Sequence, residues 1–292
     1  MAKIIDGKLL SEKIKEEVKV EVKNLREKGI SVCLAVIMVG DDPASKIYFK
    51  NKKRVCETVG IVSKEFILNA DISQQELINI IDSLNKDEKV NGILVQLPLP
   101  KHLDEKDIIA SIVPSKDVDA FHPMNVGKIM LGEYDFLPCT PAGIINLIDE
   151  TGISIEGKNC VIIGRSNIVG KPMSMLLLQK NGTVTICHSK TQNLKDITNK
   201  ADILVAAIGC PNFVKEDMIK PGAVVIDVGI NRLNDGSLCG DVNFDGANNV
   251  AEYITPVPGG VGPMTIAMLM KNTLLAAKLQ NSKLVDDFKL KN

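Results

Sequence analysis

The sequence has 292 residues, none of them tryptophan, and only 3% are aromatic. Proteins that bind single-stranded nucleic acid stack bases on aromatic rings, and those that bind duplexes carry an excess of basic residues. This chain has 35 basic and 36 acidic residues, which gives a formal net charge of −1. The composition therefore predicts no nucleic-acid partner.

Cysteine is present, but not in a pattern typical of a metal site. No two of the seven cysteines have the spacing of a zinc knuckle, and an odd number argues against a disulfide framework. Four of them lie in or beside apolar runs: Cys33, Cys160, Cys187 and Cys210. We interpret these as reduced, buried side chains, and we expect no metal site.

Long apolar runs are also missing. No run reaches the length of a membrane-spanning helix, and the segment MAKIIDGKLL lacks the apolar core of a signal peptide. We therefore expect a soluble, cytoplasmic protein that does not bind membranes. Hydrophobic residues make up 45% of the chain, which is enough for one large domain or two of ordinary size.

What is present is an alternation of apolar runs with amphipathic segments, which is typical of an α/β fold. The first half predicts strands at 32–40, near 63–68 and at 92–100, and helices at 7–28, from Pro43, and at 73–84. Pro and Gly are frequent between 120 and 140, which indicates a domain boundary. The second half predicts strands at 159–163, 183–187, 203–207 and 223–227, and helices near 142–150, 170–180, 193–199, 215–219 and 264–280.

The segment VIIGRSNIVGKPM, residues 161–173, follows a predicted strand and opens a predicted helix. A dinucleotide-binding loop belongs at this place, because amides at the helix start can face a phosphate. Gly164 and Gly170 are six positions apart, so the spacing is not GxGxxG. Taken alone the signal is weak, because structural turns of this kind are common.

The next predicted strand favours NADP over NAD. Its segment VTICHSKT, residues 184–191, lacks the acidic residue that binds the ribose hydroxyls of NAD. It offers His188, Ser189 and Lys190 instead, with Arg165 in the preceding loop. Such donors and cations suit a 2′-phosphate. Outside this context, His188 would be interpreted as an ordinary surface residue.

A second group of polar residues lies in the first half. In SKIYFKNKKR, residues 45–54, the side chains of Ser45, Tyr48 and Lys52 share one helix face, while the other bases are expected to be solvated. Gln96 lies inside an apolar run and needs a hydrogen-bond partner if buried. Asp119 follows a predicted strand and helix. Spacing alone supports a shared pocket and three unrelated polar residues equally.

Nine segments occur in an order that resembles one family: SKIYFKNKK, GILVQLPLP, KDVDAFHP, PCTPAG, IIGRSNIVGKP, CHSKT, IDVGIN, GDV and TPVPGGVGPMT. The chain is similar, from about residue 40 to 270, to the bifunctional methylenetetrahydrofolate dehydrogenase/cyclohydrolase family. The resemblance implies two α/β domains with a cleft between them. The folate-binding domain would comprise 1–139 and 273–292, and a Rossmann-type domain, 140–272, would bind NADP. It also implies a homodimer that acts on tetrahydrofolate derivatives.

The resemblance implies roles for individual residues. Lys52 would be the catalytic lysine, held by Gln96, and Tyr48 would stack on the aminobenzoyl ring of the folate. Asp119 would anchor the pterin. The remaining substrate-binding positions would be Pro258, Gly259, Gly260, Gly262, Pro263 and Thr265. The cofactor-binding positions would be Gly164, Arg165, Ser166, Val169, Gly170, His188, Ser189 and Ile230. Hydride transfer chiefly needs positioning, whereas hydrolysis needs a proton carrier, and we expect Lys52 to be that carrier.

One departure from the family and three alternatives remain at this point. Many members have glycine where this chain has Ala120, which would be strained if the backbone there has a positive φ. The alternatives are a shikimate-dehydrogenase-like NADP enzyme, a member with only one of the two activities, and a non-catalytic NADP sensor. A sensor would be expected to lose Lys52 or Asp119, and both are present.

Overall fold

The computed structural model describes residues 1–233 and 235–282, and its contacts divide the chain into two compact units. Of the described residues, the three-stranded unit holds Lys13–Lys128, Tyr134–Leu137 and 269–282. The six-stranded unit holds Met1–Glu12, Ile129–Glu133 and Pro138–Met268. Three helices have residues in both units: α1 (Gly7–Glu27), α5 (Pro123–Leu131) and α10 (Val261–Gln280).

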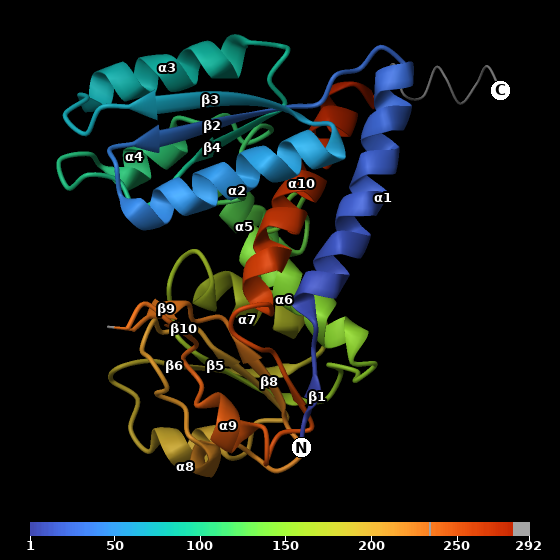
Figure 1. Ribbon diagram of the computed structural model, residues 1–292, viewed down its shortest axis with the longest axis vertical. Helices are drawn as coiled ribbons and strands as arrows, with labels where there is room; N and C mark the ends of the chain where they lie inside the picture. Colours follow the sequence, from blue (N-terminus) through green and yellow to red (C-terminus); the bar gives the residue numbers. More distant parts are fainter. Residues whose placement is uncertain (234, 283–292) are drawn as a thin grey trace. The chain divides into compact units, whose positions relative to one another are not determined.

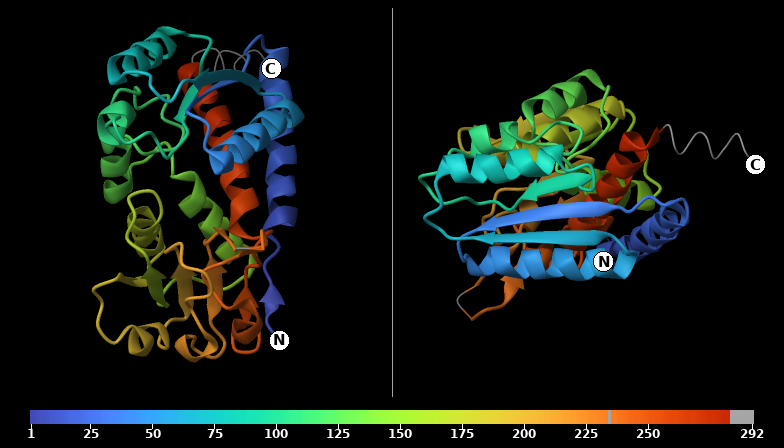
Figure 2. Two further views of the ribbon diagram at one scale, coloured as in Figure 1. Left: turned by 60° about the vertical axis from the view of Figure 1, so that its left-hand side comes forward. Right: turned by 90° about the horizontal axis from the view of Figure 1, so that it is seen from above.

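The three-stranded unit is built on a parallel sheet with the order β3-β2-β4. Besides parts of the three shared helices, the unit contains β2 (Cys33–Val39), α2 (Pro43–Val59), β3 (Val62–Leu68), α3 (Gln74–Lys86), β4 (Gly92–Val95) and α4 (Glu105–Ala110). Figures 1 and 2 show α2 and α3 on opposite faces of this sheet. All seven residues of β2 are buried, because a central parallel strand is covered on both faces.

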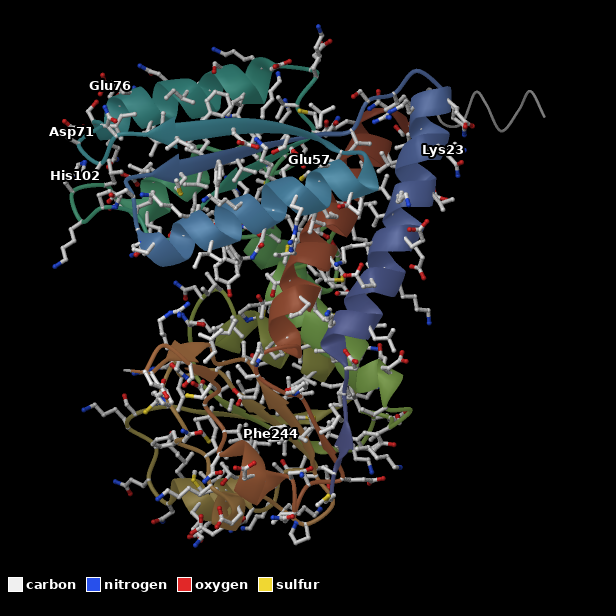
Figure 3. All side chains as sticks on the ribbon, viewed as in Figure 1. Lys23, Glu57, Asp71, Glu76, His102 and Phe244 are labelled. Atoms are coloured by element: carbon white, nitrogen blue, oxygen red, sulfur yellow. The ribbon has the colours of Figure 1, made fainter. Side chains whose placement is uncertain are left out.

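Local signals fix the ends of the helices beside this sheet. The Asp42 carboxylate accepts a hydrogen bond from the Ser45 amide at the start of α2, and Pro43 occupies the first turn. A capping box of Ser73 and Glu76 opens α3, and Figure 3 shows Glu76 at that end of the helix. At the other end of α3, the buried Lys116 ammonium donates to three main-chain carbonyls, those of Leu84, Asn85 and Asp87. This places the segment that follows Lys116 next to the sheet.

The six-stranded unit is built on a parallel sheet with the order β1-β11-β8-β7-β5-β6. Its strands are β1 (Lys3–Ile4), β5 (Asn159–Ile163), β6 (Thr183–Cys187), β7 (Ile203–Ala206), β8 (Val224–Asp227) and β11 (Tyr253–Ile254). Its other elements are α6 (Cys139–Glu150), α7 (Gly170–Gln179), α8 (Leu194–Thr198), the 3₁₀ turn η1 (Glu216–Met218), β9 (Asn231–Arg232), β10 (Leu238–Cys239) and α9 (Phe244–Ala247).

The strand order has a functional consequence. After β5 the chain forms β6 on one side of β5, and then β7 on the other side. The point where the strand order reverses is where open α/β sheets bind their ligands, beyond the carboxyl ends of the strands. The loop that leaves β5 therefore lies at the expected ligand site of this unit.

The predicted α/β class and most predicted elements are confirmed, but three boundaries were wrong, one predicted helix is a single turn, and one helix was missed. The strand predicted at 92–100 ends at Val95, because the prolines beyond it lack the amide that a strand needs. The helix predicted near 142–150 begins at Cys139, and the last helix begins at Val261. The segment 215–219 contains only the single turn η1. The helix α5 was missed, because Pro123 and Gly127 made its segment resemble a loop.

The contacts place the first twelve residues differently from the sequence-based division. The sequence assigned them to the folate-binding domain, whereas Lys3 and Ile4 pair with Tyr253 and Ile254 of the six-stranded unit. The last ten residues of the predicted 273–292 segment lie outside the described residues. Within the described residues, no helix combines the length and apolarity that a membrane crossing requires.

The seven cysteines are all free thiols. Cys33, Cys160 and Cys187 are buried as expected, but Cys210 is exposed, so that prediction was wrong for one of the four. Cys210 belongs to a loop beyond the carboxyl end of β7, where the apolar run has already ended.

Candidate functional site

The helix α2 presents two chemically different faces. Ser45 and Lys52 are 5% and 8% exposed, so one face is turned toward the protein. The side chains of Lys46, Lys50, Lys53 and Arg54 are exposed. Of the five basic residues in this stretch, only Lys52 is buried, which is the side chain that the sequence assigned to catalysis.

Lys52 and Gln96 are in direct contact. The Lys52 ammonium donates a hydrogen bond of 2.8 Å to Oε1 of Gln96. The Gln96 main-chain amide donates to the carbonyl of Ile37, and its Nε2 donates to the carbonyl of Leu97. Gln96 is therefore held by the sheet edge at its backbone and by the next residue at its amide. This arrangement fixes the position of the Lys52 amine, and it brings together two of the three polar residues that the sequence left open as a shared pocket.

Asp119 reaches the same sheet edge by a different route. A parallel bridge pairs Asp117 with Ile93 of β4. Asp119 follows in the turn after this bridge, where the Ala120 amide donates to the carbonyl of Asp117. The bridge therefore ties the turn that carries Asp119 to β4, the strand that Gln96 follows. Tyr48, one helical turn before Lys52, is half-buried, and burial raises the pKa of its phenol, so the neutral hydroxyl is favoured.

The loop that carries Asp119 is closed by its own side chains. The buried carboxylate of Asp117 accepts hydrogen bonds of 2.8 Å from the amide of His122 and from Nδ2 of Asn125. Nδ2 of Asn272 donates to the carbonyl of Val118. Within this loop Ala120 has a φ of 58° and is fully buried. The sequence predicted strain at Ala120 if its φ is positive, and the φ is positive.

The loop after β5 meets the conditions for close approach to a phosphate. Gly164 has a φ of 130°, and a Cβ there would overlap the carbonyl oxygen of Ala207. A Cβ at Gly170 would overlap the carbonyl oxygen of Gly164. Only glycine fits at these two positions, so the backbone itself can form the wall of a binding site.

Ser166 accepts hydrogen bonds from the start of the helix that follows this loop, α7. Its hydroxyl accepts hydrogen bonds from the amides of Val169 and Gly170, at 3.1 and 3.3 Å. The sequence predicted that amides at this helix start can face a phosphate. In this structure these two amides donate to the Ser166 hydroxyl. Arg165 beside it is exposed, and among the described residues it has no ion pair.

The end of β6 carries the residues expected to recognise a 2′-phosphate. Nδ1 of His188 accepts a hydrogen bond from the Lys190 amide, so a neutral His188 ring carries its proton on Nε2 and can donate from there. The amide of His188 donates to the Thr191 hydroxyl, which closes the turn. Ser189 and Lys190 are exposed. No carboxylate belongs to this turn, as the sequence predicted.

The six-stranded unit also holds the predicted residues of the PGGVGPMT segment. Gly259 has a φ of 107°, and its carbonyl accepts a hydrogen bond of 2.9 Å from the Lys8 amide. A Cβ at Gly262 would lie 3.3 Å from Cδ1 of Ile230, so a predicted substrate position and a predicted cofactor position are neighbours. Pro258 is exposed, Pro263 is half-buried, and the hydroxyl of Thr265 is 2.9 Å from that of Thr140.

The predicted site residues are thus divided between the units. Tyr48, Lys52, Gln96 and Asp119 belong to the three-stranded unit, and all the others belong to the six-stranded unit. Among the described residues, no three His, Cys, Asp or Glu side chains form a group suited to a metal ion. Sequence reasoning missed two buried carboxylates, Asp227 and Asp241, although each lies inside a segment used in the resemblance, IDVGIN and GDV. The sequence signal that could have found them is a nearby glycine: Gly229 follows Asp227 by two positions, and Gly240 precedes Asp241.

Two family models match the chain. One is described as tetrahydrofolate dehydrogenase/cyclohydrolase, catalytic domain, and it matches residues 5–119. The other is described as tetrahydrofolate dehydrogenase/cyclohydrolase, NAD(P)-binding domain, and it matches residues 138–281. Together they account for most of the chain and for both groups of predicted site residues.

Several known proteins are similar to this chain over nearly its whole length. The bifunctional protein FolD of Acetivibrio thermocellus is 64% identical, over 96% of this chain and 98% of its own. The crystal structure of the FolD enzyme from Campylobacter jejuni has a TM-score of 0.94 at 53% identity, covering 96% of this chain and 99% of its own. A FolD structure from Trypanosoma brucei, complexed with NADP cofactor and inhibitor, has a TM-score of 0.92 at 39% identity, covering 95% and 98%.

Proposed function

The chain belongs to the tetrahydrofolate dehydrogenase/cyclohydrolase family, and we propose that NADP, rather than NAD, is the hydride acceptor of its dehydrogenase reaction. As a family member it is a bifunctional enzyme of one-carbon folate metabolism, which decides against the shikimate-dehydrogenase-like, monofunctional and sensor alternatives. It oxidises 5,10-methylenetetrahydrofolate to the methenyl cation and hydrolyses that cation to 10-formyltetrahydrofolate.

The choice of NADP is supported by the residues at the cofactor loops. Gly164 and Gly170 allow the backbone to approach a pyrophosphate, and the turn after β6 offers Ser189 and Lys190 in place of an acid. The exposed guanidinium of Arg165 can form charge-assisted hydrogen bonds with a 2′-phosphate. The Trypanosoma brucei relative binds NADP, which is in line with this proposal. When bound, the nicotinamide ring accepts the hydride of the bridging carbon.

The hydrogen bond between Lys52 and Gln96 is the observation that carries the proposed cyclohydrolase site. Hydrolysis requires water to attack the methenyl carbon, lose a proton, and leave the ring nitrogen protonated as the C–N bond breaks. Lys52 would take one proton from water and return it to that nitrogen. The remaining hydroxyl proton of the adduct would leave to solvent as the formyl carbonyl forms and the C–N bond breaks. Gln96 would keep the amine in place, and a positively charged substrate beside Lys52 would favour the neutral amine as a base.

Tyr48 and Asp119 would position the folate. The half-buried ring of Tyr48 has the apolar surface needed to stack on the aminobenzoyl group. The Asp119 carboxylate can accept two parallel N–H bonds from the amino-pyrimidinone edge of the pterin. Both residues would hold the bridging carbon for hydride transfer, a step that needs positioning more than acid–base help.

A direct test uses the absorbance of the methenyl product. Purified protein is mixed with 5,10-methylenetetrahydrofolate and either NADP or NAD, and the methenyl compound is supplied separately to follow its hydrolysis. We expect turnover with NADP, little with NAD, and hydrolysis without either cofactor. Equal turnover with the two cofactors would contradict the choice of NADP without affecting the family assignment.

We also propose a cytoplasmic homodimer, as the family resemblance implies. Seven free cysteines suit a reducing compartment. β6 is the last strand in the order of the six-stranded sheet, and Ile186 on it is 37% exposed. An exposed apolar edge strand is a surface that a second copy could cover. Light scattering on the eluted protein should give twice the chain mass of 31.7 kDa, and a monomer at micromolar concentration would contradict the dimer.

A further inference from the structure

Two carboxylates lie buried beneath the loops at the carboxyl edge of the six-stranded sheet. Asp227 ends β8 and is 4% exposed, and Asp241 follows β10 and is fully buried. Neither is among the residues that the family resemblance assigned to substrate or cofactor. A buried carboxylate without hydrogen bonds is strongly unfavourable, so their partners indicate why they are tolerated.

The carboxylate of Asp241 gathers the loop that follows β7. Its Oδ2 accepts hydrogen bonds from the amides of Ile208 and Gly209, at 2.7 and 3.0 Å. Its Oδ1 accepts from the amide of Cys210 at 2.9 Å. Three successive amides therefore point at one side chain, with Gly209 in the left-handed conformation at a φ of 67°. The same loop begins at Ala207, whose carbonyl lies against Gly164 of the proposed phosphate loop.

The same carboxylate lies against both neighbours of Ile230. Nδ2 of Asn231 donates to Oδ1 of Asp241 at 2.9 Å, which makes two donors for each carboxylate oxygen. Gly229 lies so close that a Cβ there would overlap this oxygen. Ile230 between them is 46% exposed, and it is a position proposed to contact the cofactor. The two aspartates together thus hold the residues on either side of this exposed position, because Asp227 binds the Gly229 amide and Asp241 binds the Asn231 side chain.

Asp227 fixes Asp241 in turn. Its carboxylate accepts hydrogen bonds from the amides of Gly229, Asp241 and Val242, at 3.0, 2.8 and 2.9 Å. A Cβ at Gly240 would overlap the same carboxylate, so glycine is required there. The main-chain amide of Asp227 donates to the hydroxyl of Thr255, which follows β11. Loops that leave three neighbouring strands, β7, β8 and β11, are therefore tied to one pair of aspartates.

We propose that Asp241, held by Asp227, is a positioning residue for the cofactor: its carboxylate sets the loops 207–210 and 229–231 in the conformation that binds the nicotinamide dinucleotide. The inference rests on the proposed use of this unit for NADP binding. Asp241 is buried beneath the loops and acts through them. Because the cofactor is a reactant in the oxidation and not in the hydrolysis, loss of this positioning separates the two activities.

The test compares Asp241→Asn with a matched control, Asp202→Asn. An asparagine at 241 turns an NH₂ group toward two N–H donors whichever way its amide lies, which rearranges at least one loop. Asp202 also lies in the six-stranded unit and accepts the amide of Asn159, but it precedes β7, at the opposite edge of the sheet. Calorimetric titration with NADP measures cofactor binding, and hydrolysis of supplied methenyl compound without cofactor reports the integrity of the other activity.

We expect Asp241→Asn to weaken NADP binding and to lower kcat/KM for NADP at least tenfold, while cofactor-free hydrolysis stays within twofold. Asp202→Asn should leave kcat/KM for NADP and cofactor-free hydrolysis within twofold of the wild-type values. Should Asp241→Asn not fold, the milder Asn231→Ala removes one donor to Asp241 and should still weaken NADP several-fold. Equal loss of both activities, or unchanged NADP affinity, would overturn the proposal. A wild-type protein that fails to bind NADP would instead overturn the choice of cofactor.

Discussion

The amine of Lys52 and the amide oxygen of Gln96 are joined by a hydrogen bond of 2.8 Å, although 44 residues separate them in the chain. The bond connects a helix to the end of a strand, and both atoms lie within the three-stranded unit. The position of the amine is therefore fixed by the fold before substrate arrives.

Replacing Lys52 with glutamine should separate the two reactions. The side chain keeps its hydrogen-bonding ability but loses the proton that hydrolysis requires. We expect the cyclohydrolase rate to fall by about 10²- to 10⁴-fold, the usual effect of losing a general acid–base group, while dehydrogenase activity survives at a reduced level. The methenyl compound should then accumulate and be visible by its absorbance. An equal decrease in both activities would make Lys52 a binding residue and refute its role as proton carrier.

Replacing Arg165 with alanine should weaken NADP far more than NAD. A charge-assisted contact with a phosphate contributes roughly 1.5–3 kcal/mol, which corresponds to about a 10- to 150-fold change in affinity. Lys180→Ala is a suitable control, because it removes the same charge at the far end of α7, where the ammonium pairs with Asp149 at 3.1 Å. Titration with each cofactor measures the effect. If the two cofactors weakened equally, Arg165 would not recognise the 2′-phosphate.

The strongly patterned elements could be predicted from the sequence. The apolar run at 32–40 became the fully buried β2, because a strand covered on both faces contains no polar positions. The buried face of α2 followed from helical spacing, and glycines at 164 and 170 indicated a close approach of backbone. In each case the evidence lies within about ten neighbouring residues.

Features that depend on distant contacts could not be predicted. β1 has only two residues, and it exists because it pairs with β11, some 250 positions later. The buried role of Asp241 depends on amides that lie about 30 residues earlier in the chain. The segment GDV contributed to the family resemblance, but nothing in the sequence indicated which loops would meet at its aspartate.

Ala120 adopts a backbone conformation that glycine adopts more easily. Ala120→Gly loses a buried methyl group, worth about 0.8 kcal/mol, but it relieves a left-handed conformation that costs an L-residue roughly 1–2 kcal/mol. The net change in the free energy of unfolding should be small. Ala276→Gly is the control, because Ala276 is fully buried within α10. It loses the same methyl group without relieving backbone strain, and glycine in a helix interior lowers the free energy of unfolding by about 1 kcal/mol more. Urea unfolding should separate the variants by at least about 1 kcal/mol, and equal destabilisation would show that Ala120 is unstrained.

Two carboxylates of the six-stranded unit should give opposite pH dependences. Burial raises the pKa of Asp227 to about 6, from an ordinary value of 3.8. The native state therefore holds this proton more tightly, so the stability that Asp227 contributes is full below pH 3.8 and is lost as pH rises through 6. The difference in unfolding free energy between wild type and Asp227→Asn should fall by about 3 kcal/mol over that range. A constant difference would show that Asp227 does not titrate there.

Asp202 supplies the contrast. A hydrogen bond from Lys220 lowers the pKa of Asp202, so its contribution to stability is present above pH 3.8 and is lost as pH falls through the lowered value. The difference between wild type and Asp202→Asn should stay constant between pH 5 and 7 and shrink only in stronger acid. Urea unfolding at closely spaced pH values measures both curves. Parallel curves for the two variants would contradict the opposite shifts.

Gly7, at the start of α1, should not tolerate a side chain. A Cβ there would overlap the carbonyl oxygen of Gly260, and the next amide, that of Lys8, donates to the carbonyl of Gly259. The first turn of α1 therefore supports the segment proposed to contact the folate. Gly7→Ala would have to displace a backbone rather than a flexible side chain, and overpacking of this kind destabilises by about 1–3 kcal/mol. We expect lower stability together with reduced turnover of both folate substrates.

The matched control for this substitution is Gly127→Ala. Gly127 lies inside α5, and a Cβ there would meet no atom within 4 Å. Alanine is the better helix former by about 0.5–1 kcal/mol, so this variant should be as stable as wild type or slightly more stable. Thermal unfolding and the two activity assays on the same preparations distinguish the variants. A Gly7→Ala protein with wild-type stability and turnover would show that the first turn of α1 does not constrain residues 258–260.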